Sequence, residues 1–306
     1  MHIYIDRSSL FVTSSCSYLP FMLGMQPLDK FKIQRFLIKF FYHFNIKILN
    51  RIGYILFLFL VYRISISHNI KNLIFFNPIF ILRTPFIINS ALFKRLKFSC
   101  SMYLLNKFDD SDMNLFLGIS GLKLFSFDKF LADKYHIYHL PLRLDRNYLS
   151  SFSFANSSCP FVDIFFVGSL KQGREETLIK IADHCDKLNL SYLFFFPDTP
   201  SIPFKKCYNN TYLDYYEILE QVYASNSVVE ILQPGVSSST LRLPEVMFFN
   251  KKLITNASIV YQDSVISIDE FLSYDKNDFL NFVTSSTSSN KYYTLYTSYK
   301  DFFHAI

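Results

Sequence analysis

Two short polar segments hold the residues best suited to bind a phosphorylated ligand. The first, Gly168–Arg174 (GSLKQGR), is a glycine turn between an apolar run and an amphipathic run. The second, Gln233–Arg242 (QPGVSSSTLR), is rich in hydroxyl groups and ends one helical turn before Glu245. The free N–H groups and the positive dipole end of a helix N-terminus attract anions. We therefore expect phosphate groups of a ligand to lie against both segments.

An arginine and a glutamate one helical turn apart suit a sugar nucleotide. Arg242 can meet a diphosphate, while Glu245 shares its helix face and can accept hydrogen bonds from ribose hydroxyls. The alternative is a surface ion pair of little energetic weight. The expected ligand-binding residues are Gly168, Ser169, Arg174, Gly235, Ser238, Ser239, Thr240, Arg242 and Glu245. Neither GxGxxG nor GxxxxGK(S/T) occurs, which disfavours dehydrogenases and P-loop kinases.

The elements that must position these segments alternate between strands and helices. Val162–Val167 is typical of a buried strand, Arg174–Leu188 of an amphipathic helix and Leu190–Phe196 of a second strand, which together predict a βαβ unit. The alternation continues through helix Leu213–Ala224, strand Ser227–Leu232, loop Gln233–Ser239, helix Thr240–Phe249, strand Lys252–Thr255 and helix Asp269–Thr284. Open sheets of this kind bind ligands at the carboxyl ends of their strands.

The N-terminal half also predicts an α/β layer. The apolar runs Asn72–Leu82, Phe98–Leu105 and Leu122–Phe127 are typical of buried strands. The second run is followed by an acidic turn, and the third by a short helix, Lys129–Lys134, and another short strand. The Ser- and Asn-rich stretch Asp145–Cys159 is typical of a linker. We therefore predict an α/β protein with two domains, residues 1–150 and 151–306.

Charge is distributed unevenly along the chain. Up to Lys107 there are 14 Lys or Arg against two acids, a net charge of +12, so the remainder carries 17 bases against 23 acids, a net of −6. Lys30–Arg51 has a helical period with a basic face that includes Lys32, Arg35, Lys39 and Lys47, beside an apolar stripe of Ile33, Phe36, Phe40, Phe44 and Ile48. We expect this helix either to pack on a core or to lie on an anionic membrane surface.

Composition excludes several classes of protein. Half of the residues are hydrophobic, which excludes a disordered chain. The most apolar run, Tyr54–Val61, is far shorter than the roughly 20 residues that cross a bilayer. The five cysteines are scattered and form no CxxC pair, which favours reduced thiols over a disulfide framework or a zinc site. No nucleic-acid-binding motif accompanies the basic segment, so we expect no nucleic-acid partner.

Three segments, in this order, resemble bacterial glycosyltransferases that build lipopolysaccharide and capsule. They are FSFDKFLADKYHIYHLPL (Phe125–Leu142), DIFFVGSLKQGREETLIKI (Asp163–Ile181) and QPGVSSSTLRLPEVMFFNKKLITNA (Gln233–Ala257). Lipopolysaccharide core biosynthesis proteins of the RfaS type are candidates within this family. The sequence departs from the family pattern at Val236, where Gln is frequent, and at Ser239, where Gly is frequent.

The resemblance implies a GT-B fold, in which two Rossmann-like domains face a central cleft and the C-terminal domain holds a nucleotide-sugar donor. It implies transfer of a hexosyl or deoxyhexosyl group to a lipid-linked saccharide of lipopolysaccharide core, O-antigen or capsule. The protein would be peripheral at the cytoplasmic face of the bacterial inner membrane, without a cofactor or an obligatory metal. Glu245 is the implied ribose ligand. The alternative is a non-catalytic polysaccharide-assembly protein with a degenerate sugar-nucleotide domain.

Catalysis is the part for which the sequence offers fewest candidates. Inverting transfer needs a general base near the acceptor hydroxyl, whereas retaining transfer does not. In the implied architecture the base comes from the N-terminal half, where acids are scarce. The candidates are Asp109, Asp110 and Asp112, with His43 and His68 as secondary choices. The competing interpretation of the three acids is a solvated turn.

Overall fold

The computed structural model forms two compact units, Met1–Pro141 with Phe303–Ile306 and Leu142–Phe302. The first unit therefore ends before the predicted boundary at residue 150. The structure describes residues 2–6, 9–13, 59, 62–64, 71–76, 99–104, 108–144, 146–154, 159–170, 173–201, 204, 207–208, 211, 213–258 and 264–285. Each unit is described by itself below.

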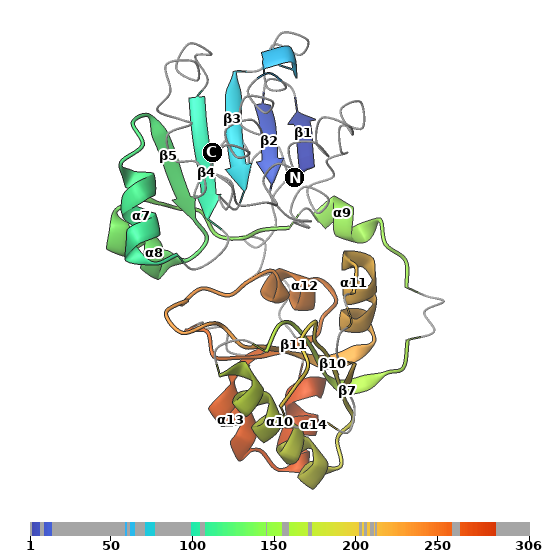
Figure 1. The fold of residues 1–306 in the computed structure, drawn as a ribbon. Helices are drawn as coiled ribbons and strands as arrows, with labels where there is room; N and C mark the ends of the chain where they lie inside the picture. The colour runs from blue at the N-terminus through green and yellow to red at the C-terminus, as the bar shows by residue number, and fades with distance from the viewer. Residues whose placement is uncertain are drawn as a thin grey trace. The chain divides into compact units, whose positions relative to one another are not determined.

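The first unit is built on a six-stranded sheet with strands in chain order (Figure 1). Its strands are β1 (His2–Asp6), β2 (Ser9–Thr13), β3 (Asn72–Phe76), β4 (Ser99–Leu104), β5 (Leu122–Ser126) and β6 (Tyr138–His139). β1 pairs antiparallel with β2, and every later pair is parallel. Strands β3, β4 and β5 agree with predicted strands, whereas the β1–β2 pair was not predicted.

Two helices of the first unit begin at aspartate caps. Helix α7 (Asp110–Leu117) is capped by Asp109, and α8 (Lys129–Tyr135) is capped by Asp128. A carboxylate at this position accepts a hydrogen bond from a free N–H group of the first turn. The acidic stretch Phe108–Asp112, predicted to be a turn, is therefore the start of a helix, and that prediction was wrong.

The second unit is also built on a six-stranded sheet, in the order β12-β11-β10-β7-β8-β9, and all of its pairs are parallel. Its strands are β7 (Val162–Val167), β8 (Tyr192–Phe195), β9 (Cys207–Tyr208), β10 (Ser225–Glu230), β11 (Lys252–Thr255) and β12 (Val265–Ser267). Its helices are α9 (Arg146–Ser150), α10 (Arg174–Leu188), α11 (Tyr215–Tyr223), α12 (Arg242–Phe248), α13 (Ile268–Ser273) and α14 (Lys276–Thr284). Both units are thus α/β with mostly parallel sheets, which confirms the predicted fold class.

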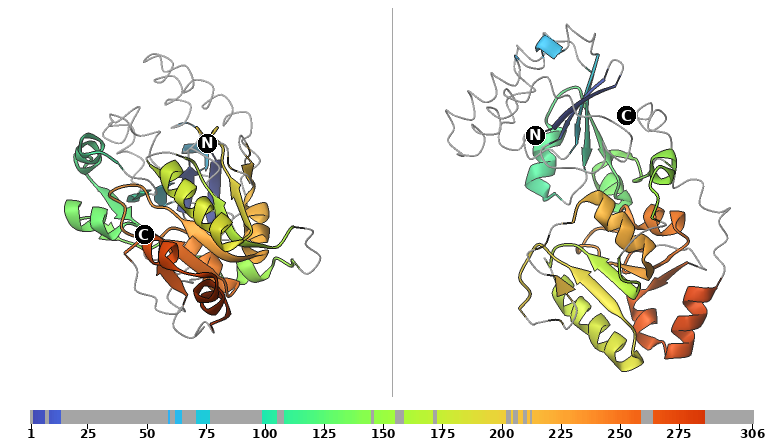
Figure 2. Two further views of the ribbon diagram at one scale, coloured as in Figure 1. Left: turned by 90° about the horizontal axis from the view of Figure 1, so that it is seen from below. Right: turned by 90° about the vertical axis from the view of Figure 1, so that its right-hand side faces the viewer.

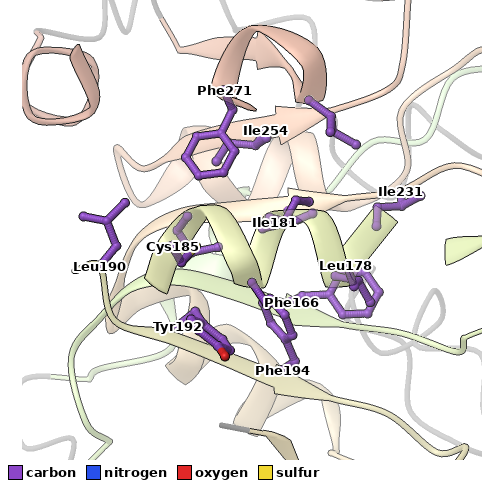
Figure 3. Close-up of a cluster of buried hydrophobic side chains, with 14 of the residues drawn as sticks. Phe166, Leu178, Ile181, Cys185, Leu190, Tyr192, Phe194, Ile231, Ile254 and Phe271 are labelled. Carbon is purple, nitrogen blue, oxygen red and sulfur yellow. The ribbon is translucent and has the colours of Figure 1, made fainter. Parts of the chain in front are cut away.

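Helices cover both faces of this second sheet (Figure 1, Figure 2). Apolar residues of α10, α13 and α14 pack with one face, and those of α11 and α12 pack with the other. Figure 3 shows Leu178, Ile181 and Cys185 of α10 over aromatic side chains of the strands, among them Phe166 and Phe194. Burial of one large apolar side chain stabilises a fold by about 1.5–3 kcal/mol. The two cores therefore hold the strand ends in fixed positions.

The described part of the stretch predicted to be a linker contains residues that pack on the second unit. Part of it forms α9, where Leu149 is buried. The buried ring of Phe154 then lies 5.2 Å from that of Tyr216 and 5.7 Å from that of Phe249, between ring centroids. These aromatic contacts were not predicted, because the stretch is mostly polar in composition.

Among the described residues, no helix is long and apolar enough to cross a bilayer.

Candidate functional site

The two predicted ligand-binding segments leave neighbouring strands at the point where the strand order of the second sheet reverses. From β7 the chain continues outward through β8 and β9, and it then returns to the other side of β7 with β10, β11 and β12. The loops after β7 and β10 therefore leave the carboxyl ends of two adjacent strands and run in opposite directions across the sheet. Parallel α/β sheets bind ligands outside the carboxyl ends of the strands at such a reversal.

The first segment follows β7 closely. A Cβ atom on Gly168 would lie 3.1 Å from the ring of Phe166, which it would crowd, and at an ordinary contact distance of 3.8 Å from a guanidinium nitrogen of Arg174. Asp198, which follows β8, accepts a hydrogen bond of 2.7 Å from the backbone of Leu170. Gly173 has φ +79°, a conformation that favours glycine, and it caps α10. The loop is thus held close to the sheet.

Arg174 turns back over this loop from the first turn of α10. One guanidinium nitrogen donates to the Ser169 carbonyl at 3.2 Å and to the Ser169 hydroxyl at 3.5 Å. Burial lowers the pKa of Arg174, and the negative charge of Glu230 opposes this shift. Nε of Arg174 is buried and finds no hydrogen-bond partner among the residues that the structure describes. The guanidinium therefore retains a donor that a ligand oxygen could use.

The second segment begins with a tight turn after β10. The backbone N–H of Val236 donates to the Gln233 carbonyl at 3.0 Å, and Gly235 takes φ +82°. The half-buried Ser238 lies further along the segment. Ser239 and Thr240 then hydrogen-bond to the carboxylate of Glu230 at 2.7–2.8 Å. The hydroxyl-rich loop is thus folded back onto the end of its own strand.

Glu230 is the residue of this site that the sequence analysis missed. It ends β10 and is 4% exposed. Its charge acts on Arg174 of the first segment and raises the pKa of Glu245 beyond the second. The signal that could have revealed it is a single charge inside the apolar run SVVEIL, because a charged side chain is rarely buried in a strand unless it has bonding partners. Glu230 thus bonds to the second segment, and its charge acts on the arginine of the first.

Arg242 and Glu245 form the ion pair that their spacing allows, but not at the surface. Arg242 donates to Oε2 of Glu245, whose side chain is fully buried. Burial raises the pKa of Glu245, while the Arg242 charge and the nearby Tyr215 hydroxyl lower it. Within the described chain, no group meets Oε1 of Glu245 in hydrogen-bond geometry. A surface ion pair is thus excluded, because the carboxylate is buried, with the Tyr215 hydroxyl as a further neighbour.

The three acids proposed as general bases lie in the first unit, and two of them make structural contacts. Asp109 accepts hydrogen bonds from Asp112 N and the Ser111 hydroxyl, and these lower its pKa. Asp110 bonds to Lys134 at 2.7 Å and to Tyr135, and both contacts lower its pKa. Partial desolvation and the charge of Asp109 raise the pKa of Asp112. Asp112 is thus the one of the three whose pKa is raised.

Several predicted residues lie outside the described residues. They are the basic residues Lys32, Arg35, Lys39 and Lys47, the secondary bases His43 and His68, and Lys171 and Gln172 of the first segment. Within the described ranges there is no group of three or more His, Cys, Asp and Glu residues arranged to hold a metal ion.

Comparison with known proteins finds similarity of fold only. No family model matches the chain, and a search of curated proteins finds no significant match. Among solved structures, the fold is similar to the lipopolysaccharide outer core galactosyltransferase WaaB in its apo form, with TM-score 0.48, 11% identity and coverage of 85% of this chain and 81% of that one. It is similar to the avilamycin A biosynthesis glycosyltransferase AviGT4 at TM-score 0.48 and 7% identity, over 76% and 82% of the two chains. A Rickettsia africae glycosyltransferase gives TM-score 0.45 and 12% identity, over 80% of each chain.

Proposed function

We propose that the protein is a glycosyltransferase that moves a hexosyl or deoxyhexosyl group from a nucleotide sugar to a lipid-linked saccharide. The acceptor class is lipopolysaccharide core, O-antigen or capsule, and the enzyme works at the cytoplasmic face of the bacterial inner membrane. The observation that carries the proposal is the placement of Arg174 after β7, and of the Arg242–Glu245 pair after the neighbouring β10, at the strand-order reversal of the second sheet. The acceptor class rests on the sequence resemblance.

Each group has a chemical role that its surroundings support. Arg174 has an unused buried Nε donor, and Arg242 is partly exposed, so both can contact the phosphates of a nucleotide diphosphate. The same contacts stabilise the negative charge that grows on the departing nucleotide during transfer. Oε1 of Glu245 is an unused buried acceptor, which suits a ribose hydroxyl. Because the side chain of Glu245 is fully buried, this contact requires neighbouring side chains to move aside. No step in this scheme calls for a metal or a cofactor.

If transfer inverts the anomeric centre, Asp112 is the preferred base of the three acids. Its raised pKa favours uptake of the acceptor proton, whereas hydrogen bonds already hold Asp109 and Asp110 in their ionised forms. A retaining reaction leaves all three acids without a catalytic role.

The test is donor binding by purified full-length protein, measured by calorimetry with UDP-, GDP-, dTDP- and CMP-sugars. Arg242→Ala and Glu245→Gln each should weaken binding of the preferred donor by about tenfold or more, because each removes a charged hydrogen-bonding group. Lys180 and Asp183 are both exposed on α10. Lys180→Ala removes one positive charge and is the control for Arg242→Ala, and Asp183→Asn removes one negative charge and is the control for Glu245→Gln. Wild-type affinity in both site variants would overturn the site assignment.

The second candidate is a non-catalytic assembly protein with a degenerate sugar-nucleotide domain. Two observations favour it: Val236 departs from the family pattern, and two of the three candidate bases are held in structural contacts. Donor binding without hydrolysis or transfer to any lipid-linked acceptor would support this candidate. Release of free nucleotide in the presence of acceptor would reject it.

A further inference from the structure

Glu230 is held by four hydrogen bonds from neutral donors. Oε1 accepts from the backbone N–H and the hydroxyl of Thr240, both at 2.7 Å. Oε2 accepts from the hydroxyls of Ser239 at 2.8 Å and Thr255 at 2.9 Å. Burying a carboxylate is costly unless its oxygens are hydrogen-bonded. The four bonds satisfy this carboxylate without an ion pair to any described residue.

These bonds join three segments at the carboxyl ends of the strands, where the candidate site lies. Glu230 ends β10, Thr255 ends the adjacent β11, and Ser239 and Thr240 belong to the loop that leads into α12. The other end of the loop is fixed as well, because the Asn256 side chain bonds both backbone groups of Leu232 at 2.7 and 3.3 Å. The intervening residues are thus clamped at both ends.

The direction of these bonds limits what the loop can offer to a ligand. The hydroxyl hydrogens of Ser239 and Thr240 point to Glu230, so only oxygen lone pairs remain for other contacts, and Thr240 already accepts one long hydrogen bond of 3.4 Å from the Arg242 backbone N–H. Phosphate oxygens without protons only accept hydrogen bonds and gain nothing from a lone pair. Ribose and sugar hydroxyls can donate to one.

We infer that Glu230 is a positioning residue of the donor site, which fixes Ser239 and Thr240 so that they accept hydrogen bonds from hydroxyls of the donor. This inference rests on the proposed function and revises one part of the sequence analysis, in which the loop hydroxyls would meet phosphate. Phosphate recognition is left to the two arginines.

The test compares Glu230→Gln with Asp163→Asn in the full-length protein. The glutamine keeps the side-chain shape but turns one acceptor oxygen into a donor group, which frees the loop. We expect affinity for the preferred nucleotide sugar to fall by about tenfold. The donor KM should rise by a similar factor with little change in kcat. Hydrogen exchange in the peptide around Thr240 should become faster, with or without the nucleotide sugar.

Asp163 is a matched control near the amino end of a strand in the same sheet, whereas Glu230 lies at the carboxyl end of its strand. It lies in β7 and accepts hydrogen bonds from Ser191 N and the Ser191 hydroxyl, both at 2.8 Å, and from Asn226 at 3.0 Å. Asp163→Asn should lower thermal stability but leave affinity for the nucleotide sugar unchanged. Equal losses of affinity in both variants would show a merely structural role for Glu230.

A second variant keeps the inference testable if Glu230→Gln does not fold. Thr255 is 1% exposed, so it does not contact a ligand itself and acts on one indirectly, through its hydrogen bond to Glu230. Thr255→Val removes one donor from Glu230, and the acceptor of the Ala257 N–H, with almost no change in shape, and should weaken donor binding by a few fold. Unchanged affinity in a folded Glu230→Gln or Thr255→Val variant, with a wild-type protein that binds, overturns this inference alone. A wild-type protein that binds no nucleotide sugar overturns the proposed function as well.

Discussion

At the scale of single residues, the site contains two buried carboxylates with opposite surroundings. Glu230 accepts four hydrogen bonds, two on each oxygen. Glu245 has one arginine on Oε2 and no hydrogen bond to Oε1 from the described residues. An unmet buried acceptor costs about 1–3 kcal/mol. In the proposed function, Glu245 is therefore the residue at which stability is lower so that a ligand can be bound.

This difference predicts how stability depends on pH. Burial raises the pKa of Glu245 above its ordinary value of 4.5, so the folded protein binds this proton more tightly than the unfolded chain. The contribution of Glu245 to stability is then lost as pH rises from 4.5 through the raised pKa of the folded state. Glu245→Gln cannot ionise and should gain stability relative to the wild type across this window.

Urea unfolding of both proteins between about pH 4.5 and pH 8 measures this difference. Asp183→Asn, which removes an exposed carboxylate from α10, controls for the change in net charge. A gap between Glu245→Gln and the wild type that stays constant over the range would contradict the expected burial penalty.

The residues of the site were only partly predictable from sequence. The spacing of Arg242 and Glu245 predicts that they share a helix face, and the structure pairs them. Their burial depends on how α12 packs against the sheet, which spacing does not report. Glu230 was overlooked because a strand pattern identifies its apolar neighbours, while its four donors come from segments 9 to 25 residues away. Contacts between residues so far apart in sequence can be identified only once the fold is known.

At the scale of elements, prediction succeeded where local signals were strong. β7, α10 and β11 have the predicted bounds. α10, for example, begins after Gly173 and ends at Asn189, both in the left-handed conformation, with acids in its first turn and Lys187 in its last. In contrast, the three-residue β12 was missed. Its register against β11, Leu253 with Val265, is set by tertiary pairing rather than by its own sequence.

The predicted helix Asp269–Thr284 is two helices, and Asp275 is the reason. Its side chain accepts from the backbone N–H groups of Asn277 and Asp278, and the Asp278 side chain accepts from Asp275 N in return. This capping box starts α14 after a break at Tyr274, so that Phe279 and Phe282 reach the core.

Removal of this cap should destabilise the second unit. We expect Asp275→Ala to lower the free energy of unfolding by about 1 kcal/mol, because the first turn of α14 loses its hydrogen-bond acceptor. Asn277→Ala is the matched control: this residue is exposed in the same turn and takes part in the cap only through its backbone. Chemical denaturation followed by circular dichroism provides the measurement. Equal effects of the two substitutions would show that the cap does not stabilise α14.

At the scale of the whole molecule, two sheets of the same kind belong to halves of opposite charge. The basic half begins the first unit, whereas the candidate donor site lies in the second unit, within the acidic part of the chain. In the proposed function, an anionic nucleotide sugar is therefore bound by a few placed arginines rather than by a general positive field. The broad positive charge is left for another anionic partner, and we propose that this partner is the membrane surface.

The last prediction follows from that charge. Each Lys or Arg near an anionic leaflet contributes about 1 kcal/mol, so replacing Lys32, Arg35, Lys39 and Lys47 by Gln should weaken binding to phosphatidylserine-containing vesicles by about a hundredfold or more. Added salt should release the wild-type protein, because screening shortens the reach of surface charges. Four exposed lysines elsewhere, Lys123, Lys180, Lys187 and Lys276, replaced in the same way, remove the same charge and should leave most of the binding. Equal losses in both variants would mean that net charge, and not a basic helix face, attaches the protein, since only a localised face distinguishes the two sets.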